Sequence, residues 1–260
     1  MTRVALVTGA ARGIGAATVR TLAAQGWAVL AVDSTKDDPA LPYPMATDAE
    51  LSTVVVEGGE RVASFVADVR EAGALAAAVA EAEARWGGLD AAIAAAGVIA
   101  GGVPAWEVPP EQEQAVLDVN LRGVLNLARA AVPALLRRPS PRSGRFLAVA
   151  SAAATRGLPM LAAYCAAKAG VAGLVRALAA ELGDSGVTAN AVSPGSTDTA
   201  MLRETARLYA LDSAEEFATR QPFRRLLHPT EVAEVLAFLA GPASSGMTGA
   251  VVPVDGGLSL

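Results

Sequence analysis

The chain has 260 residues, of which 53% are hydrophobic and 18% are charged, and its formal net charge is −5 at pH 7. This composition supports a sizeable buried core and leaves no basic surface for a nucleic-acid backbone. No apolar run is long enough to predict a membrane span, and the opening sequence MTRVALVTGA lacks an export leader, so we expect a cytoplasmic protein without a membrane partner. One cysteine and one histidine predict no metal site.

Short β-rich runs alternate with helical patterns along the whole chain. The predicted strands are residues 3–9, 27–33, 62–68, 89–97, 144–151, 187–195 and 250–257. Helical periodicity occupies residues 13–25, 73–86, 111–138, 160–182 and 230–240. This alternation predicts an α/β fold: a single Rossmann domain over residues 1–260, with a doubly wound, seven-stranded parallel sheet and helices on both faces.

Two long connections interrupt the alternation. Residues 34–59 make the connection after the second strand about ten residues longer than a compact one needs, and three prolines near its start exclude a continuous helix there. Residues 196–229 separate the sixth strand from the next clear helix, a length typical of a functional lid. We expect the first segment to be an insertion that clamps the adenosine half of a nucleotide, and the second to cover a substrate.

The first predicted strand runs directly into the glycine-rich sequence TGAARGIGAA, residues 8–17. Such a strand-to-helix turn brings the backbone close to a pyrophosphate and points the free N–H groups of a helix at it. The turn supplies five residues expected to bind a dinucleotide, namely Gly9, Arg12, Gly13, Ile14 and Gly15.

The ends of the next strands are expected to complete the nucleotide site. Asp33 ends the second strand, where a carboxylate binds the adenine ribose hydroxyls and repels a 2′-phosphate, which favours NAD over NADP. Arg12 is the contrary signal, because an arginine near this position favours a phosphate. Asp68 and the Val69 N–H are expected to reach the adenine. The small residues Ala95, Ala96 and Gly97 let the cofactor lie against the backbone.

Tyr164 and Lys168 are four residues apart and therefore neighbours on one helix face. A buried ammonium beside a phenol lowers the phenol pKa, so we expect Tyr164 to act as a general base near neutral pH. Ser151, at the end of the fifth strand, is expected to hold the substrate oxygen. The side-chain amide of Asn120 is expected to point inward and bind a water that relays protons to Lys168.

The motifs TGAARGIG, VNLRG, Ser151, YCAAK and SPGSTDT, followed by VDGG, resemble in this order those of the short-chain dehydrogenase/reductase family. The resemblance covers essentially the whole chain. It implies a bound nicotinamide cofactor, usually a homotetramer, and a catalytic tetrad of Tyr164, Lys168, Ser151 and Asn120, of which Tyr164 and Lys168 also contact the cofactor.

The same resemblance extends the cofactor site beyond the nucleotide end. It places Pro194, Gly195 and Thr199 around the nicotinamide amide and adds Thr197 to the site. Ala95 departs from the family pattern, because the family usually has an asparagine there that braces the centre of the sheet.

Two narrower resemblances compete within the family. The segment after Asp33 is similar to that of the actinobacterial carveol-dehydrogenase-like enzymes associated with mycofactocin, a group in which NAD stays on the enzyme and electrons leave through a separate redox carrier. The sequence NAVSPGSTDTAM resembles the diol dehydrogenases of the 2,3-dihydro-2,3-dihydroxybenzoate type, which lack that segment. The segment favours the first group.

We therefore expect an NAD-dependent alcohol dehydrogenase/ketoreductase (EC 1.1.1.-) that interconverts a secondary alcohol and a ketone. The diol dehydrogenase and a catalytically inactive nucleotide-sensing module are the alternatives. The 196–229 segment favours an apolar, cyclic small-molecule substrate, with ordinary packing as the other explanation of its large side chains, Met201, Leu202, Leu208, Tyr209, Phe217 and Phe223.

Overall fold

The computed structural model describes residues 2–260 and contains one parallel sheet with the strand order β3-β2-β1-β4-β5-β6-β7. The strands are β1 (Val4–Thr8), β2 (Ala28–Asp33), β3 (Val62–Val66), β4 (Ala91–Ala94), β5 (Arg145–Val149), β6 (Thr188–Pro194) and β7 (Val251–Val254). Every neighbouring pair is parallel. The predicted doubly wound sheet is confirmed, and each strand lies inside its predicted range.

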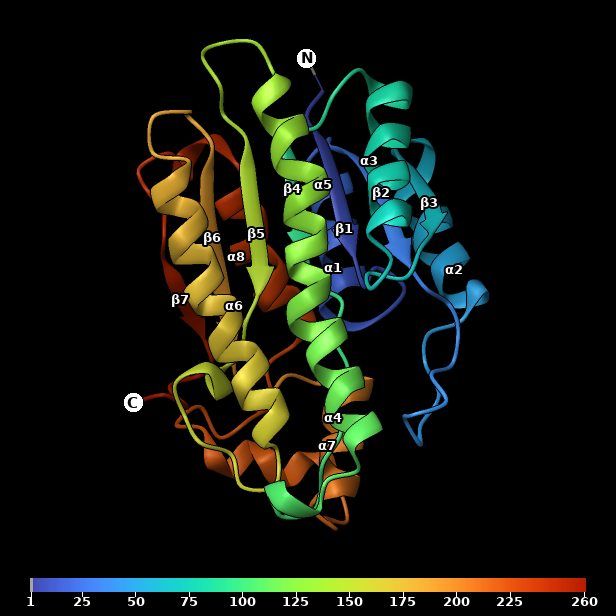
Figure 1. Ribbon diagram of the computed structural model, residues 1–260, viewed down its shortest axis with the longest axis vertical. Helices are drawn as coiled ribbons and strands as arrows, with labels where there is room; N and C mark the ends of the chain where they lie inside the picture. Colours follow the sequence, from blue (N-terminus) through green and yellow to red (C-terminus); the bar gives the residue numbers. More distant parts are fainter. Residues whose placement is uncertain (1) are drawn as a thin grey trace.

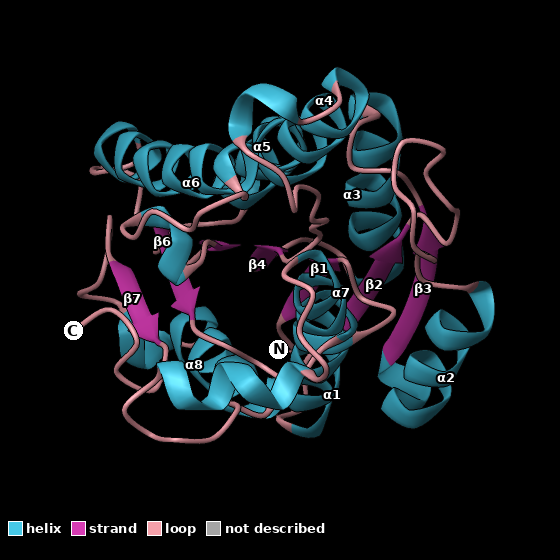
Figure 2. Cartoon of the chain, turned by 90° about the horizontal axis from the view of Figure 1, so that it is seen from below, coloured by secondary structure: helices cyan, strands magenta, loops and turns pink. Residues whose placement is uncertain are grey.

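Helices cover both faces of this sheet (Figures 1 and 2). One face carries α3 (Ala72–Trp86), α5 (Gly123–Arg137) and α6 (Ala162–Glu181), and the other carries α1 (Gly13–Ala24), α2 (Asp48–Gly58) and α8 (Pro229–Ala240). α4 (Pro110–Leu117) and α7 (Ala200–Leu208) lie at the end of the molecule toward which the strands point (Figure 1).

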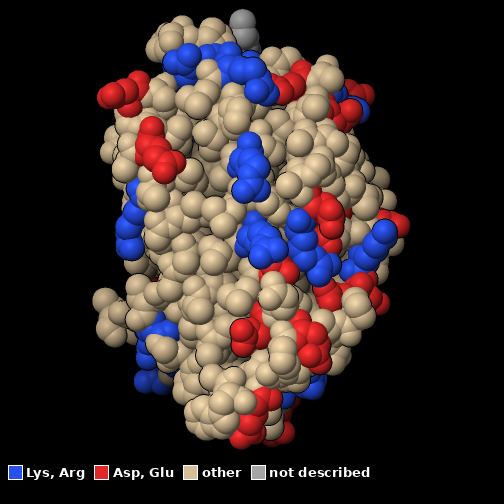
Figure 3. Space-filling model, viewed as in Figure 1, with Lys and Arg blue, Asp and Glu red and all other residues tan. Residues whose placement is uncertain are grey.

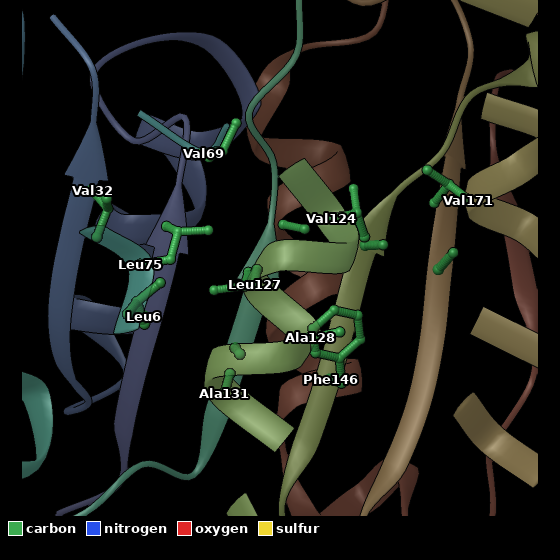
Figure 4. Close-up of a cluster of buried hydrophobic side chains, with 14 of the residues drawn as sticks. Leu6, Val32, Val69, Leu75, Val124, Leu127, Ala128, Ala131, Phe146 and Val171 are labelled. Carbon is green, nitrogen blue, oxygen red and sulfur yellow. The ribbon is translucent and has the colours of Figure 1, made fainter. Parts of the chain in front are cut away.

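The core lies between the sheet and its two helical layers. Most strands are buried along their whole length, because both faces of the sheet are covered. On the α3 and α5 side, Leu6 and Phe146 of the sheet pack against Leu75 and Leu127 of the helices (Figure 4). Burial of this kind contributes roughly 1.5–3 kcal/mol per large apolar side chain.

The predicted 34–59 insertion divides into two parts. Residues 34–47, hereafter the 34–47 loop, contain no helix or strand, and α2 follows as the crossover helix to β3. A reciprocal capping box starts α2: the Thr47 hydroxyl accepts from the Glu50 N–H, and the Glu50 carboxylate accepts from the Thr47 N–H. The part of the connection that exceeds an ordinary crossover is therefore the loop alone.

The expectation of no clear helix between residues 196 and 229 is wrong. This segment contains α7 and a 3-10 helix over Ala214–Arg220. The Thr199 hydroxyl accepts a hydrogen bond from the Leu202 N–H at 3.2 Å and caps α7.

Helix α6 corrects another expectation. It has 20 residues and a mean hydropathy of 1.2, so by length and composition alone it reaches the size of a membrane span. In the structure it lies along the sheet beside α5 (Figure 1), and Val171, Val175 and Ala179 are buried in the core. This buried face positions Tyr164 and Lys168 at the helix start.

Candidate active site

The carboxyl ends of the strands open into a cavity of about 510 Å³. The glycine-rich turn, Asp33 and Asp68 line one end, and Ser151, Tyr164 and Lys168 line the other. Every residue that the sequence analysis assigned to the cofactor also lines this cavity. Of the expected tetrad, only Asn120 lies outside the lining.

The glycine-rich turn is packed too closely for larger residues. A Cβ atom on Gly9 would lie 2.6 Å from the backbone of Ala96, and one on Gly15 would lie 2.0 Å from the Gly9 carbonyl oxygen. Gly9 and Gly13 also have φ angles of +66° and +59°, which favour glycine. Gly9, Gly13 and Gly15 also line the cavity, so the backbone at the start of α1 faces it, and this cradle fits the pyrophosphate of a dinucleotide.

Asp33 is fixed at the end of β2 by backbone donors. One carboxylate oxygen accepts from the Ala11 N–H at 3.0 Å, and the other accepts from the Ser34 N–H at 2.8 Å. This orients the carboxylate in the cavity wall, where it fits the ribose of NAD. Arg12 donates to the Pro44 carbonyl oxygen at 3.2 Å, so it contacts the 34–47 loop.

Asp68 has a partner that the sequence analysis missed. Its two carboxylate oxygens accept from Arg70, whose Nη2 lies 2.6 Å from Oδ2, and another nitrogen of the same guanidinium lies 2.6 Å from Asp38. Burial acts to raise the Asp68 pKa, but the hydrogen bonds from Arg70 outweigh it and hold the pKa below its ordinary value. Arg70 therefore joins the end of β3 to the 34–47 loop.

Tyr164 and Lys168 are both buried, with exposed fractions of 8% and 4%. The Lys168 ammonium donates to the Val149 carbonyl oxygen at 2.8 Å and lies 5.7 Å from the centroid of the Tyr164 ring. Burial lowers the Lys168 pKa to about 8. Burial also raises the Tyr164 pKa, against an opposing hydrogen bond from Ser151.

The expected lowering of the Tyr164 pKa by Lys168 is therefore wrong for this structure. Desolvation of the phenol dominates, and the lysine directs its hydrogen bond to the backbone of β5 instead of the phenol.

Asn120 lies in a π-helical turn, Asp118–Arg122, which joins α4 to α5 within the predicted helix 111–138. Its side chain is fully buried. The amide oxygen accepts from the Val98 N–H at 2.9 Å, and the amide nitrogen donates to the Val98 carbonyl at 2.8 Å. Both ends of the amide bind the Val98 backbone, and the expected water relay to Lys168 stays a prediction. Asn120 positions the loop after β4.

A threonine braces the sheet centre beside Ala95. The N–H groups of Ala95 and Ala96 both lie within hydrogen-bonding distance of the Thr8 hydroxyl, at 3.2 and 3.3 Å. Thr8 ends β1, next to β4, and holds the small residues that line the cavity.

Beyond Tyr164, the 196–229 segment encloses the cavity. The Met201 sulfur lies 3.9 Å from the Tyr164 hydroxyl, and the Tyr209 hydroxyl donates to the Pro159 carbonyl at 2.6 Å. Leu202 and Phe217 also line this end. Two of the large side chains expected here do not: Leu208 lines a separate cavity of about 210 Å³ and not the main one, and Phe223 is 62% exposed.

The chain is similar to known oxidoreductases over nearly its whole length. A family model described as enoyl-(acyl carrier protein) reductase matches residues 9–259. The chain is 38% identical to cis-4-hydroxycyclohexanecarboxylate dehydrogenase of Sinomonas cyclohexanicum, over 98% of this chain and 96% of the relative. It is 34% identical to (−)-trans-carveol dehydrogenase of Rhodococcus erythropolis, over 99% and 98% of the two chains. Carveol dehydrogenase of Mycobacterium avium, solved in complex with NAD, superposes with a TM-score of 0.92 at 30% identity, over 98% and 97% of the two chains.

Proposed function

Because the chain belongs to the short-chain dehydrogenase/reductase family and is an NAD-dependent oxidoreductase, we propose that it interconverts a secondary alcohol on a ring with the corresponding ketone. The observation that carries this proposal is the placement of Tyr164, Lys168 and Ser151 at one end of the cavity whose other end carries Asp33 and the glycine-rich turn.

The chemistry divides between the cofactor and the protein. Bound NAD supplies the acceptor for the hydride that leaves the carbinol carbon. Tyr164 takes the hydroxyl proton, and Ser151, which lines the same end of the cavity, holds the same substrate oxygen. Lys168 lies beside Tyr164, with its ammonium 5.7 Å from the ring centroid, and would hold the ribose of bound NAD. Asn120 fixes the loop after β4 through Val98.

The residues that would hold NAD share one property, which is that they line the cavity between Asp33 and Tyr164. They are Gly9, Arg12, Gly13, Ile14, Gly15, Asp33, Asp68, Val69, Ala95, Ala96, Gly97, Tyr164, Lys168, Pro194, Gly195, Thr197 and Thr199. At Gly195 the backbone packs so closely against Asp255 that a Cβ atom would lie 2.6 Å from the Asp255 carbonyl oxygen.

The substrate end favours an apolar ring. Met201, Leu202, Tyr209 and Phe217 line it, and the two dehydrogenases above are named for ring alcohols. The test is the reduction of NAD by the protein with a panel of cyclohexanols, carveol and 4-hydroxycyclohexanecarboxylate. Reduced cofactor with at least one ring alcohol supports the proposal. Its absence with the whole panel, while NAD binds, would favour a nucleotide-sensing module.

Asp33 is expected to set the choice of cofactor. In an Asp33→Ala variant, loss of the carboxylate removes both the ribose hydrogen bonds and the repulsion of a 2′-phosphate. We expect the ratio of NADP to NAD affinity to rise by about tenfold or more, as for loss of a charged hydrogen bond. Fluorescence titration with each cofactor measures the ratio, and Asp48→Ala, an exposed carboxylate outside the cavity, is the control. Equal affinities in the unmutated protein would contradict this role.

We also propose that the 34–47 loop clamps the adenosine half of NAD. Three separate contacts tie it across the cavity mouth: Asp38 to Arg70, the Pro44 carbonyl to Arg12, and the Tyr43 hydroxyl, which accepts from the Ile99 N–H at 2.9 Å. Leu41 is buried in the core at 6% exposure, and burial raises the Tyr43 pKa to about 12. A loop anchored at three points around the cavity is suited to slowing NAD release.

Replacing residues 37–46 with a short Gly/Ser turn should speed NAD dissociation, because it removes all three anchors. We expect an increase of at least about tenfold, since each anchor is worth on the order of 1 kcal/mol. Stopped-flow displacement of bound NAD measures the rate. Asp38→Asn should give a smaller increase, and Glu57→Gln, which breaks an ion pair with Arg20 outside the cavity, should give none. An unchanged rate in the shortened protein would show that the loop has no role in NAD retention. It would also remove the support for electron transfer from retained NAD to a separate redox carrier.

The face formed by α5 and α6 has few charged side chains, with broad uncharged areas between them (Figure 3). On α5, Leu125 is 41% exposed. We propose that such small and apolar helix faces pack between subunits of a homotetramer, since close helix packing requires them.

A further inference from the structure

The two ends of the main cavity differ in charge. Its carboxylates, Asp33, Asp38 and Asp68, all belong to the adenosine half, on or after β2 and β3. Around Tyr164 the lining contains no Asp or Glu. It contains two arginines instead, Arg156 and Arg220. The substrate end is therefore apolar and positively charged at once.

Arg220 is held in place by aromatic rings. Its guanidinium carbon lies 4.8 Å from the centroid of the Phe217 ring and 5.6 Å from that of the Tyr209 ring. The two rings meet edge to face at 6.1 Å, and Tyr209 is itself fixed by its hydrogen bond to Pro159. A guanidinium stacked on rings keeps its N–H edge available for a planar anion.

Neither cavity arginine forms an ion pair with a residue in the described range 2–260. The neighbouring arginines of the same segment do: Arg203 pairs with Asp198 at 2.8 Å, and Arg207 pairs with Glu204 at 2.6 Å. Arg224 is also without an ion pair in the described range, but of these arginines only Arg220 lines the main cavity.

Arg156 approaches the same end from the loop after β5. One of its nitrogens donates to the carbonyl oxygen of Leu258, which also lines the cavity. The contact fixes the guanidinium beside the C-terminal segment and leaves its other N–H groups without a protein partner among residues 2–260. Arg156 and Arg220, which belong to different loops, thus both supply hydrogen-bond donors at the substrate end of the cavity.

We propose that Arg220, with Arg156 as a second donor, binds a carboxylate on the substrate, so that the substrate class is a ring alcohol that carries a carboxylate group. The inference rests on the proposed function, because it concerns the end of the substrate that lies away from the hydroxyl group deprotonated by Tyr164. A carboxylate matches the arginine fork, and the apolar wall between the arginines and Tyr164 accommodates the ring. Both arginines are solvent-exposed, so screening limits their effect to about tenfold in affinity.

The test is calorimetric titration of the NAD-loaded protein with cyclohexanecarboxylate and with cyclohexanecarboxamide, which share size and ring but differ in charge. We expect the acid to bind about tenfold more tightly than the amide. Arg220→Gln should abolish that preference, and Arg220→Lys should restore part of it. Arg224→Gln is the matched control, because Arg224 is exposed, lies four residues away and does not line the cavity.

Equal binding of acid and amide, no binding of the acid, or an unchanged preference in Arg220→Gln would overturn the inference. Because neither ligand carries a hydroxyl group, this result is independent of oxidation. Failure of the proposed function would appear separately, as the absence of cofactor reduction with every ring alcohol.

Discussion

Replacing Tyr164 with phenylalanine should abolish turnover while leaving NAD binding nearly unchanged. The variant removes one oxygen from a buried side chain and keeps the ring that packs in the core. Proton transfer by a positioned general base contributes a factor of about 100 to 10,000, and the loss should fall in or above that range. Activity above about one-tenth of the wild-type value would contradict the assignment of Tyr164 as the base.

The chain supplies a matched control for this variant. Tyr209 lines the same cavity, so Tyr209→Phe tests whether loss of any hydroxyl there has the same effect. We expect this control to keep a far higher turnover number than Tyr164→Phe, because loss of its hydrogen bond to Pro159 affects the substrate end and not proton transfer. Since burial raises the Tyr164 pKa, the phenolate is scarce at neutral pH, and the oxidation rate of the wild type should rise with pH. A pH-independent rate would show that a group other than Tyr164 accepts the proton.

Replacing Lys168 with methionine should lower activity and raise stability. The variant removes the cation beside the Tyr164 ring and the group that would hold the nicotinamide ribose, which we expect to lower turnover by about 100-fold, as for loss of a preorganised electrostatic group. Burial lowers the Lys168 pKa from 10.5 to about 8, which corresponds to a cost of about 3 kcal/mol for the buried ammonium at pH 7. Removing the buried charge therefore stabilises the variant, but loss of the hydrogen bond to the Val149 carbonyl oxygen offsets about 1 kcal/mol or more of this stabilisation. The free energy of unfolding should therefore rise by about 1–2 kcal/mol.

The pH dependence identifies the source of this gain. The folded-state pKa of Lys168 is below its unfolded value, so the unfolded chain binds the extra proton between the two values, and wild-type stability rises with pH from about 8 to about 10.5. The advantage of Lys168→Met should thus be complete below pH 8 and shrink toward pH 10, as measured by urea denaturation. Lys36→Met, at the other lysine of the chain, is the control. A pH-independent difference would mean that packing, not charge, separates the variants.

Much of the fold was predictable because the signals are local. Each strand is a short apolar run, and the main helices follow from periodicity. The spacing of Tyr164 and Lys168 placed both on one helix face, and the glycine-rich turn marked the start of α1. The sequence also contains local signals for two helices that we did not predict. Thr47 with Glu50 marks the start of α2, and Thr199 marks the start of α7.

The missed parts of the site depend on contacts between distant segments. No spacing rule pairs Arg70 with Asp38, or places the Tyr43 hydroxyl on the Ile99 N–H. The partner of the Asn120 amide is backbone 22 residues away, so the sequence did not show that it holds Val98. The Tyr164 pKa depends on burial, which becomes known only when the helices are packed on the sheet.

The most direct test of the central claim follows the hydride itself. The NAD-loaded protein would be mixed in a single turnover with a ring alcohol carrying deuterium on its carbinol carbon, and the reduced cofactor analysed by mass spectrometry. We predict that the deuterium appears in the nicotinamide ring and that Tyr164→Phe forms almost none of this product. Ketone formed without deuterium in the cofactor, or full deuterium transfer in Tyr164→Phe, would contradict NAD-dependent oxidation through Tyr164.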